Sequence, residues 1–159
     1  MAVDRLRIGQ GFDVHPWSDD PQRPLMLGGV CFEGHRGLAG HSDADVIAHA
    51  CTDALLGAAG MGDIGTLFPD TDPALAGADS IDLLRKAADQ LEAAGWKVFN
   101  VDCTVVLDTP KLAPRRHDME LRLSDATGAP VTVKGKRTEG IEAMAAGVCC
   151  YASALIGAR

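Results

Sequence analysis

Aromatic residues are scarce in this chain, and it also lacks long apolar runs and an excess of basic residues. Phe, Trp and Tyr make up 4% of 159 residues, so the core of this 47% hydrophobic chain must be built mainly from aliphatic side chains. No apolar run reaches the roughly 18 residues that span a bilayer. The net charge of −7 argues against nucleic acid as the main partner. Length and composition predict a single compact domain over residues 1–159.

The five cysteines are odd in number and contain no C-x-x-C pair. We therefore expect buried, reduced thiols rather than a disulfide framework. Residues 1–7 lack the apolar segment of a signal peptide. These features together predict a soluble cytoplasmic protein with no membrane partner.

Hydrophobic periodicity and turn residues predict strands that alternate with helices. The expected strands are residues 6–8, 25–32, 98–107 and 131–134, and the expected helices are residues 42–59, 81–94 and 114–126. The second strand is predicted to form a hairpin with the first, whereas residues 147–156 suit either a buried helix or a strand. The pattern predicts an α/β (α+β) fold in which a mixed β-sheet packs against helices.

The most informative stretch begins at His41, where imidazoles and carboxylates recur at helical spacing. If Ser42 caps a helix, His41, Asp45, His49 and Asp53 fall at successive i, i+4 positions and form one polar stripe. Such a stripe is typical of a metal or phosphate site, and a helix N-terminus favours an anion. The alternative is a solvated helix face.

Two further potential metal ligands, Asp13 and His15, lie upstream. In an extended chain, residues i and i+2 point to the same face, so this carboxylate and imidazole project together. With His49 they would supply one oxygen and two nitrogens, a donor set that suits zinc and leaves a fourth tetrahedral position open. This interpretation requires the fold to bring a strand and a helix together.

Several motifs now carry a resemblance to one enzyme family. They are G-F-D-V-H at 11–15, H-S-D-A-D-V at 41–46, D-A-L-L-G-A at 53–58, G-D-I-G at 62–65 and F-P-D-T-D-P at 68–73. Together they closely resemble the 2-C-methyl-D-erythritol 2,4-cyclodiphosphate synthases, the ring-closing enzymes of non-mevalonate isoprenoid synthesis. The resemblance covers residues 7–138 and implies a compact α/β subunit, a homotrimer, and active sites at the subunit boundaries.

The resemblance also implies roles for individual residues. Asp13, His15 and His49 match zinc ligands, and Glu139 matches the ligand of a second divalent cation, Mg²⁺ or Mn²⁺, bound with substrate. The residues implied to be catalytic are His41, Ser42, Lys136, Arg137 and Thr138. The residues implied to bind substrate are Asp63, Gly65 and Asp70 and, in a cytosine pocket from a neighbouring subunit, Leu107, Pro110, Lys111, Leu112 and Ala113.

The implied reaction is an intramolecular phosphoryl transfer on a cytidine diphosphate ester. The 2-phosphate of 4-diphosphocytidyl-2-C-methyl-D-erythritol 2-phosphate attacks the β-phosphorus, the cyclodiphosphate closes, and CMP leaves. A phosphate monoester is largely ionised near neutral pH, so a general base is not needed. Catalysis then depends on positioning and on neutralising the anions.

The C-terminal part of the chain departs from the family's pattern. Lys136 and Arg137 stand where many members have threonines, and residues 145–149 replace a Gly-Arg-Gly-Glu-Gly stretch beside the trimer's central cavity. Two other functions would use the same metal set. A metal-dependent hydrolase would not need the cytosine pocket around Pro110 and Lys111, and a non-catalytic nucleotide sensor would not need two metal sites.

Overall fold

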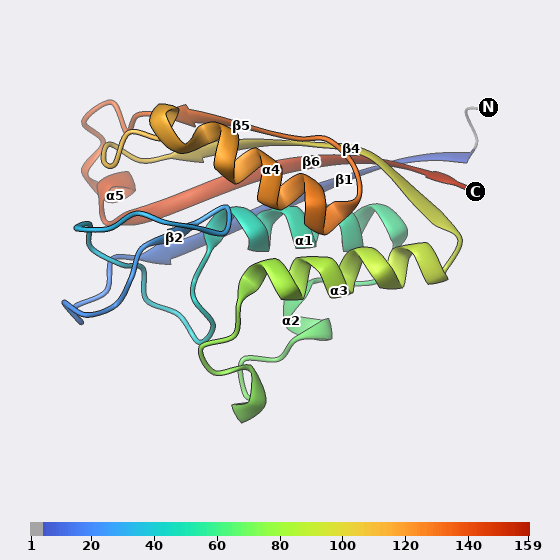
Figure 1. Ribbon diagram of the computed structural model, residues 1–159, viewed down its shortest axis with the longest axis horizontal. Coiled ribbons are helices and arrows are strands. Elements are labelled where there is room, and N and C mark those ends of the chain that lie inside the picture. Colours follow the sequence, from blue (N-terminus) through green and yellow to red (C-terminus); the bar gives the residue numbers. More distant parts are fainter. Residues whose placement is uncertain (1–4) are drawn as a thin grey trace.

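A mixed four-stranded sheet carries the main helices on one face in the computed structural model, which describes residues 5–159 (Figure 1). The strand order is β1 (Leu6–Pro16), β6 (Gly147–Ala158), β4 (Trp96–Val106) and β5 (Val131–Lys136). β6 runs antiparallel to both of its neighbours, and β5 runs parallel to β4. The predicted fold class is therefore confirmed, and the ambiguous C-terminal segment is a strand.

The helices and short elements follow in chain order. They are β2 (Met26–Leu27), β3 (Val30–Cys31), α1 (Val46–Ala59), α2 (Ile64–Leu67), the 3-10 turn η2 (Pro73–Leu75), α3 (Ser80–Ala93), the 3-10 turn η3 (Ala113–Arg115), α4 (Arg116–Thr127) and α5 (Glu142–Ala145). α1 ends at Gly60 and α4 at Gly128, each in the left-handed conformation that glycine adopts easily, as the sequence predicts.

The N-terminal residues 1–4, which belong to the segment in which no signal peptide is predicted, lie outside the described residues. Across residues 5–159, no helix is both long and apolar enough to cross a membrane. All five cysteines are free, but Cys31 is exposed and Cys149 is half-buried. The expectation of buried thiols therefore holds only for Cys51, Cys103 and Cys150.

The predicted hairpin between residues 6–8 and 25–32 is wrong. β1 pairs with β6 along its whole length, from Leu6 opposite Gly157 to Pro16 opposite Gly147. Residues 25–32 instead fold back on themselves, and β2 pairs with β3. The turn between them requires positive φ, 58° at Gly28 and 74° at Gly29, which only glycine adopts without strain.

The predicted helix start at Ser42 is also wrong, because Asp45 caps α1. Its Oδ1 accepts hydrogen bonds from the N–H groups of Ile47 and Ala48, each 3.2 Å long. The same buried carboxylate accepts from Gly28 N–H at 2.9 Å and Gly29 N–H at 2.6 Å. One side chain thus joins the β2–β3 turn to the first turn of α1, which fixes where the helix begins. The sequence also predicts Ser80 as the cap of the helix expected at 81–94, but Asp79 caps α3, and its side chain accepts Ile81 N–H.

α1 lies directly against β1 because two strand residues have no side chain. A Cβ added at Gly9 would lie 1.9 Å from the Ala54 carbonyl oxygen, and one at Gly11 would lie 1.9 Å from that of Ala50. Alternate strand residues share a face, so Gly9 and Gly11 stand on the face that also carries Asp13 and His15. The close packing therefore brings α1 beside these two side chains.

The opposite face of the sheet exposes large apolar side chains. We call Ile8, Phe12, Val14 and Tyr151 the outer apolar patch; they are 79%, 45%, 54% and 44% exposed. Phe12 and Tyr151 are register partners on β1 and β6, and their ring centroids lie 4.9 Å apart. Exposed apolar clusters of this kind are typical of interaction surfaces.

The packing of α1 on β1 predicts opposite effects for two glycine substitutions. Gly11→Ala should lower the free energy of unfolding by about 2–3 kcal/mol, because its Cβ would overlap the α1 backbone. Gly57→Ala is the matched control within α1, where the new Cβ would meet Gln10 O at an ordinary 3.7 Å. It should raise stability by about 0.5–1 kcal/mol. Denaturant unfolding measures both, and equal effects would contradict the packing argument.

Candidate functional site

Three side chains from β1 and α1 converge on one point. Asp13 Oδ2 lies 2.9 Å from His15 Nε2 and 3.0 Å from His49 Nδ1, and the two nitrogens are 3.2 Å apart. Ligand atoms on a tetrahedral metal with bonds near 2.0 Å lie about 3.3 Å from one another. Within residues 5–159 this is the one group of three His, Cys, Asp or Glu donors so closely placed. The donor set and its spacing fit a divalent cation.

Asp13 and His15 also have shifted pKa values. Burial raises the pKa of Asp13, but hydrogen bonds and charge from His15 and His49 outweigh this effect and lower it to about 2. Burial lowers the pKa of His15, but the Asp13 carboxylate raises it more, above its ordinary value. Because a cation must displace the proton from His15, its affinity for the site increases with pH.

Hydrogen bonds orient both imidazoles toward the convergence point. His15 Nδ1–H donates to Ala39 O at 2.8 Å, which leaves Nε2 as the ligand atom. His49 Nε2–H donates to Ser80 Oγ at 2.8 Å, and Ser42 Oγ lies 3.1 Å from the same nitrogen. The Ser80 hydroxyl in turn donates to the Asp43 carboxylate, which also accepts Ser80 N–H. This Asp43–Ser80–His49 chain fixes the tautomer in which His49 Nδ1 carries the free lone pair.

The sequence did not reveal this supporting chain. Ser80 resembles an ordinary helix cap, and Asp43 sits in a polar loop, so neither shows a periodic signal. The chain becomes visible only when α3 is packed beside α1.

A cavity of about 400 Å³ opens next to the three donors. Four further residues that the sequence predicts for the site also line it: His41, Ser42, Gly65 and Asp70. Asp63 lies beside them as the cap of α2, where its carboxylate accepts from Thr66 N–H and Oγ1–H, each at 2.8 Å. The Thr66 hydroxyl and N–H lower the pKa of Asp63.

The predicted polar stripe along one helix does not form, although both of its histidines, His41 and His49, line the cavity. Because α1 begins at Val46, His41 lies outside the helix, with its Nε2 2.8 Å from Asp72 O. Asp45 is buried under the β2–β3 turn, and Asp53 accepts from Ile64 N–H at 2.7 Å, which anchors α2. These carboxylates therefore hold the fold around the cavity and do not line it.

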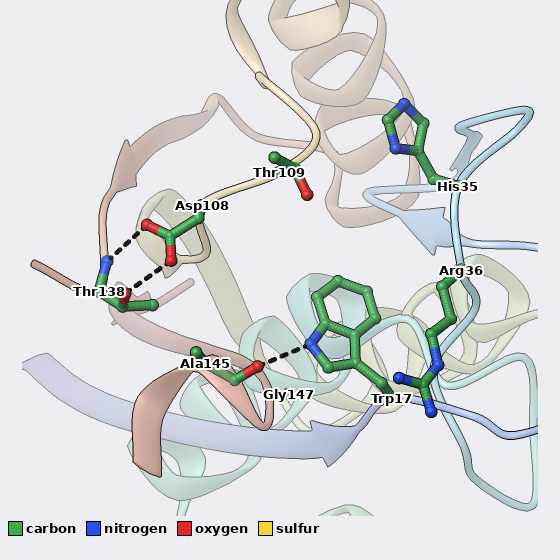
Figure 2. A pocket seen from close by; sticks show the side chains of 8 residues that line it. All are labelled: Trp17, His35, Arg36, Asp108, Thr109, Thr138, Ala145 and Gly147. Carbon is green, nitrogen blue, oxygen red and sulfur yellow. Dashed lines mark hydrogen bonds between the residues drawn. The ribbon is translucent and has the colours of Figure 1, made fainter. Parts of the chain in front are cut away.

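The remaining predicted residues form a separate group beyond the ends of β4 and β5. A second cavity of about 350 Å³ lies there, lined by Trp17, His35, Arg36, Asp108, Thr109, Thr138, Ala145 and Gly147 (Figure 2). The predicted residues in this part of the chain differ in burial. The exposed ones are Lys111, Ala113, Lys136, Arg137 and Glu139, and the buried ones include Leu107, Pro110 and Leu112. Among the described residues, none of the predicted set between 107 and 139 lines the first cavity.

Similarity to a known protein family covers both the metal-donor site and the group of residues beyond the ends of β4 and β5. The model of the YgbB family matches residues 6–157. The chain belongs to the YgbB family. That match includes every residue that lines the two cavities described above.

Several YgbB relatives have names or solved structures. A 2-C-methyl-D-erythritol 2,4-cyclodiphosphate synthase of Cupriavidus metallidurans is 51% identical over 159 residues, 97% of this chain and 94% of that relative. A solved synthase of the same name, in its CDP-bound form, is 40% identical, with a TM-score of 0.85 over 94% of this chain and 99% of that chain. The bifunctional IspDF of Campylobacter jejuni is 37% identical, with a TM-score of 0.89; the match covers 97% of this chain and 42% of that longer one.

The hydrogen-bond chain to His49 predicts that Ser80→Ala weakens metal binding. Without the hydroxyl, His49 loses the nearer of the two oxygens around its Nε2 and its link to Asp43, and metal affinity should fall about 10–100-fold. Competition with a chelator of known affinity measures the change. Ser124→Ala is the control, because it removes a serine that accepts Val131 N–H in a different part of the fold. Equal metal affinities for the two variants would contradict the assignment.

Proposed function

We propose that this chain converts 4-diphosphocytidyl-2-C-methyl-D-erythritol 2-phosphate to 2-C-methyl-D-erythritol 2,4-cyclodiphosphate and CMP, in isoprenoid precursor biosynthesis. The observation that carries the proposal is the convergence of Asp13, His15 and His49 beside a cavity. It occurs in a chain that is 51% identical to a synthase of this name.

The chemistry requires little covalent work from the protein. A 2-phosphate oxygen forms a bond to the β-phosphorus, the bond from that phosphorus to the α–β bridging oxygen breaks, and CMP leaves with the electron pair. The attacking phosphate is already ionised near neutral pH. The residues therefore act by holding the two phosphates in line and by balancing their charge.

We propose Zn²⁺ as the cation of the three-donor site. One carboxylate oxygen and two imidazole nitrogens suit zinc, and their arrangement leaves one tetrahedral position for substrate. When bound, zinc supplies Lewis-acid charge to the attacked phosphate. Glu139, exposed after β5, is proposed to hold the second divalent cation, Mg²⁺ or Mn²⁺, together with the substrate.

The substrate contacts form two proposed sets. In the metal cavity, His41 and Ser42 would contact the phosphate and methylerythritol groups, Asp63 and Gly65 the ribose, and Asp70 the methylerythritol end. In the second set, Lys136, Arg137 and Thr138 would form the phosphate segment. The cytosine pocket would be built from Leu107, Pro110, Lys111, Leu112 and Ala113.

A homotrimer would join the two sets across a subunit boundary. Two observations support it: no residue of the second set lines the metal cavity of the same chain, and the outer apolar patch is exposed on one face of the sheet. The proposed location is cytoplasmic, which agrees with five free cysteines in the described chain.

The direct test of the reaction is incubation of the purified chain with the cytidine diphosphate substrate. We expect CMP and the cyclic product in equal amounts, and a strong chelator should stop both. His49→Ala should retain little metal and lose at least about 100-fold in activity, whereas the exposed His117→Ala on α4 should match the parent. Release of CMP with a linear phosphate would indicate a hydrolase instead.

Mixing two inactive variants tests whether the site is shared. His49→Ala removes the metal half, and Lys111→Ala removes the pocket half. Each trimer that contains both chains has one boundary at which the two intact halves meet, so mixing should restore part of the activity. Mass spectrometry of intact assemblies confirms mixing. Mixed trimers without activity, or a fully active monomer in sedimentation, would refute a shared site.

A further inference from the structure

The ends of the parallel strands β4 and β5 lie side by side, and one carboxylate connects the segments that follow them. Val106 is the register partner of Lys136, and Leu107 N–H donates to Lys136 O at 2.9 Å. Just beyond this point, Asp108 accepts two hydrogen bonds from Thr138 (Figure 2). The backbone N–H lies 3.2 Å from Oδ1, and the hydroxyl oxygen lies 2.6 Å from Oδ2.

These bonds determine what Thr138 can still do. Thr138 is buried, 2% exposed, and it donates both its N–H and its hydroxyl hydrogen to Asp108. Only acceptor positions remain on its hydroxyl oxygen. Phosphate oxygens are acceptors as well, so in this arrangement Thr138 has no hydrogen left to donate to a phosphate.

Arg137 has the opposite properties. Its side chain is 79% exposed, and its Nε lies 3.7 Å from Asp108 Oδ1. This contact orients one edge of the guanidinium and leaves its other N–H groups accessible. Guanidinium groups bind phosphates through paired, charge-assisted hydrogen bonds. The hydrogen bonds from Thr138 and the charge of Arg137 lower the pKa of Asp108, so the carboxylate stays an acceptor at neutral pH.

Glu139 follows immediately in a conformation that needs support. Its φ is 54°, in the left-handed region that side chains other than glycine seldom adopt. Such backbones persist where neighbouring contacts hold them. Thr138 is held from both sides, by Asp108 and through its own carbonyl, which accepts Ile141 N–H at 3.0 Å. The clamp on Thr138 therefore fixes the residue before Glu139.

We propose that Asp108 is a positioning residue that clamps the 136–139 segment onto the 107–113 loop, so that Arg137, and not Thr138, contacts the substrate phosphate. The same clamp also holds Glu139 in its position. The inference rests on the proposed function, which assigns the loop to the cytosine pocket and the segment to the phosphates and the second cation. It adds Asp108 to that site and assigns the phosphate contact to Arg137 and the structural contact to Thr138.

The test compares Asp108→Asn, Thr138→Val and Arg137→Gln with a matched control. Asp102→Asn is the control because Asp102 on β4 likewise accepts a threonine hydroxyl from β5, that of Thr132, at 2.7 Å, on the same two strands. The measurements are CDP affinity by titration calorimetry in Mg²⁺, the Mg²⁺ concentration for half-maximal turnover, zinc content, and assembly.

Asp108→Asn and Thr138→Val should each raise the required Mg²⁺ concentration about fivefold to tenfold, because each removes the hydrogen bond that the Thr138 hydroxyl donates to the Asp108 carboxylate. The double variant should be no worse than either single variant, since the two residues act through one contact. Arg137→Gln should weaken CDP binding about tenfold at unchanged Mg²⁺ dependence. Zinc content and assembly should stay unchanged in all variants, and Asp102→Asn should match the parent.

Parental Mg²⁺ dependence in Asp108→Asn would overturn the proposal, and so would a loss of zinc or assembly in that variant, which would indicate a general effect on the fold. A larger loss of CDP affinity in Thr138→Val than in Arg137→Gln would return the phosphate contact to Thr138. Calorimetry with CDP needs no turnover. A parent chain that binds CDP without releasing CMP from substrate would therefore refute the proposed reaction, while the CDP arm still decides the roles of Arg137 and Thr138.

Discussion

The closeness of α1 to β1 is the constraint on which the metal site depends. Two donors stand on the strand and one on the helix, and short Asp and His side chains can meet only if the two backbones nearly touch. Gly9 and Gly11 make that contact possible, because any Cβ there would overlap the helix backbone. The position of α1 along the strand is fixed separately, by the buried Asp45 that binds both the helix start and the β2–β3 turn. Site geometry and fold stability thus come from the same contacts.

What could be predicted from the sequence follows from how local each signal is. The Asp-x-His spacing on an extended strand and the glycine at the end of α1 act over a few residues, and both predictions are confirmed. The start of α1 depends on the hydrogen bonds that Gly28 and Gly29 donate to Asp45, which are distant in sequence. The local capping pattern therefore predicts Ser42, which is wrong. The partner of β1 lies at the other end of the chain, and no local pattern points to it. Ser80 was missed for the same reason, since its role exists only between two packed helices.

Metal donors and predicted nucleotide contacts occupy different places on the subunit, and this separation affects how the departures near residues 136–149 are understood. Lys136 and Arg137, which stand where the family resemblance implies threonines, belong to the segment proposed to bind phosphate, and the Asp13–His15–His49 cluster is intact. The small apolar residues between 145 and 149 include the start of β6, where Val148 pairs with His15 on β1. The departures near residue 136 are therefore separate from the metal donors, whereas the segment at 147–149 is part of the sheet that holds His15 in place.

The place of β6 in the sheet has a consequence for how the protein is made. β6 lies between β1 and β4, yet it is translated after all other elements. Until β6 has been synthesised, β1 has no strand to pair with, because its partner lies more than a hundred residues further along the chain. Long-range pairing of this kind slows folding and prolongs exposure of strand edges. β1 can therefore join the sheet only after β6 has been made, so the edge of the sheet next to the metal donors is the last part of this fold to close.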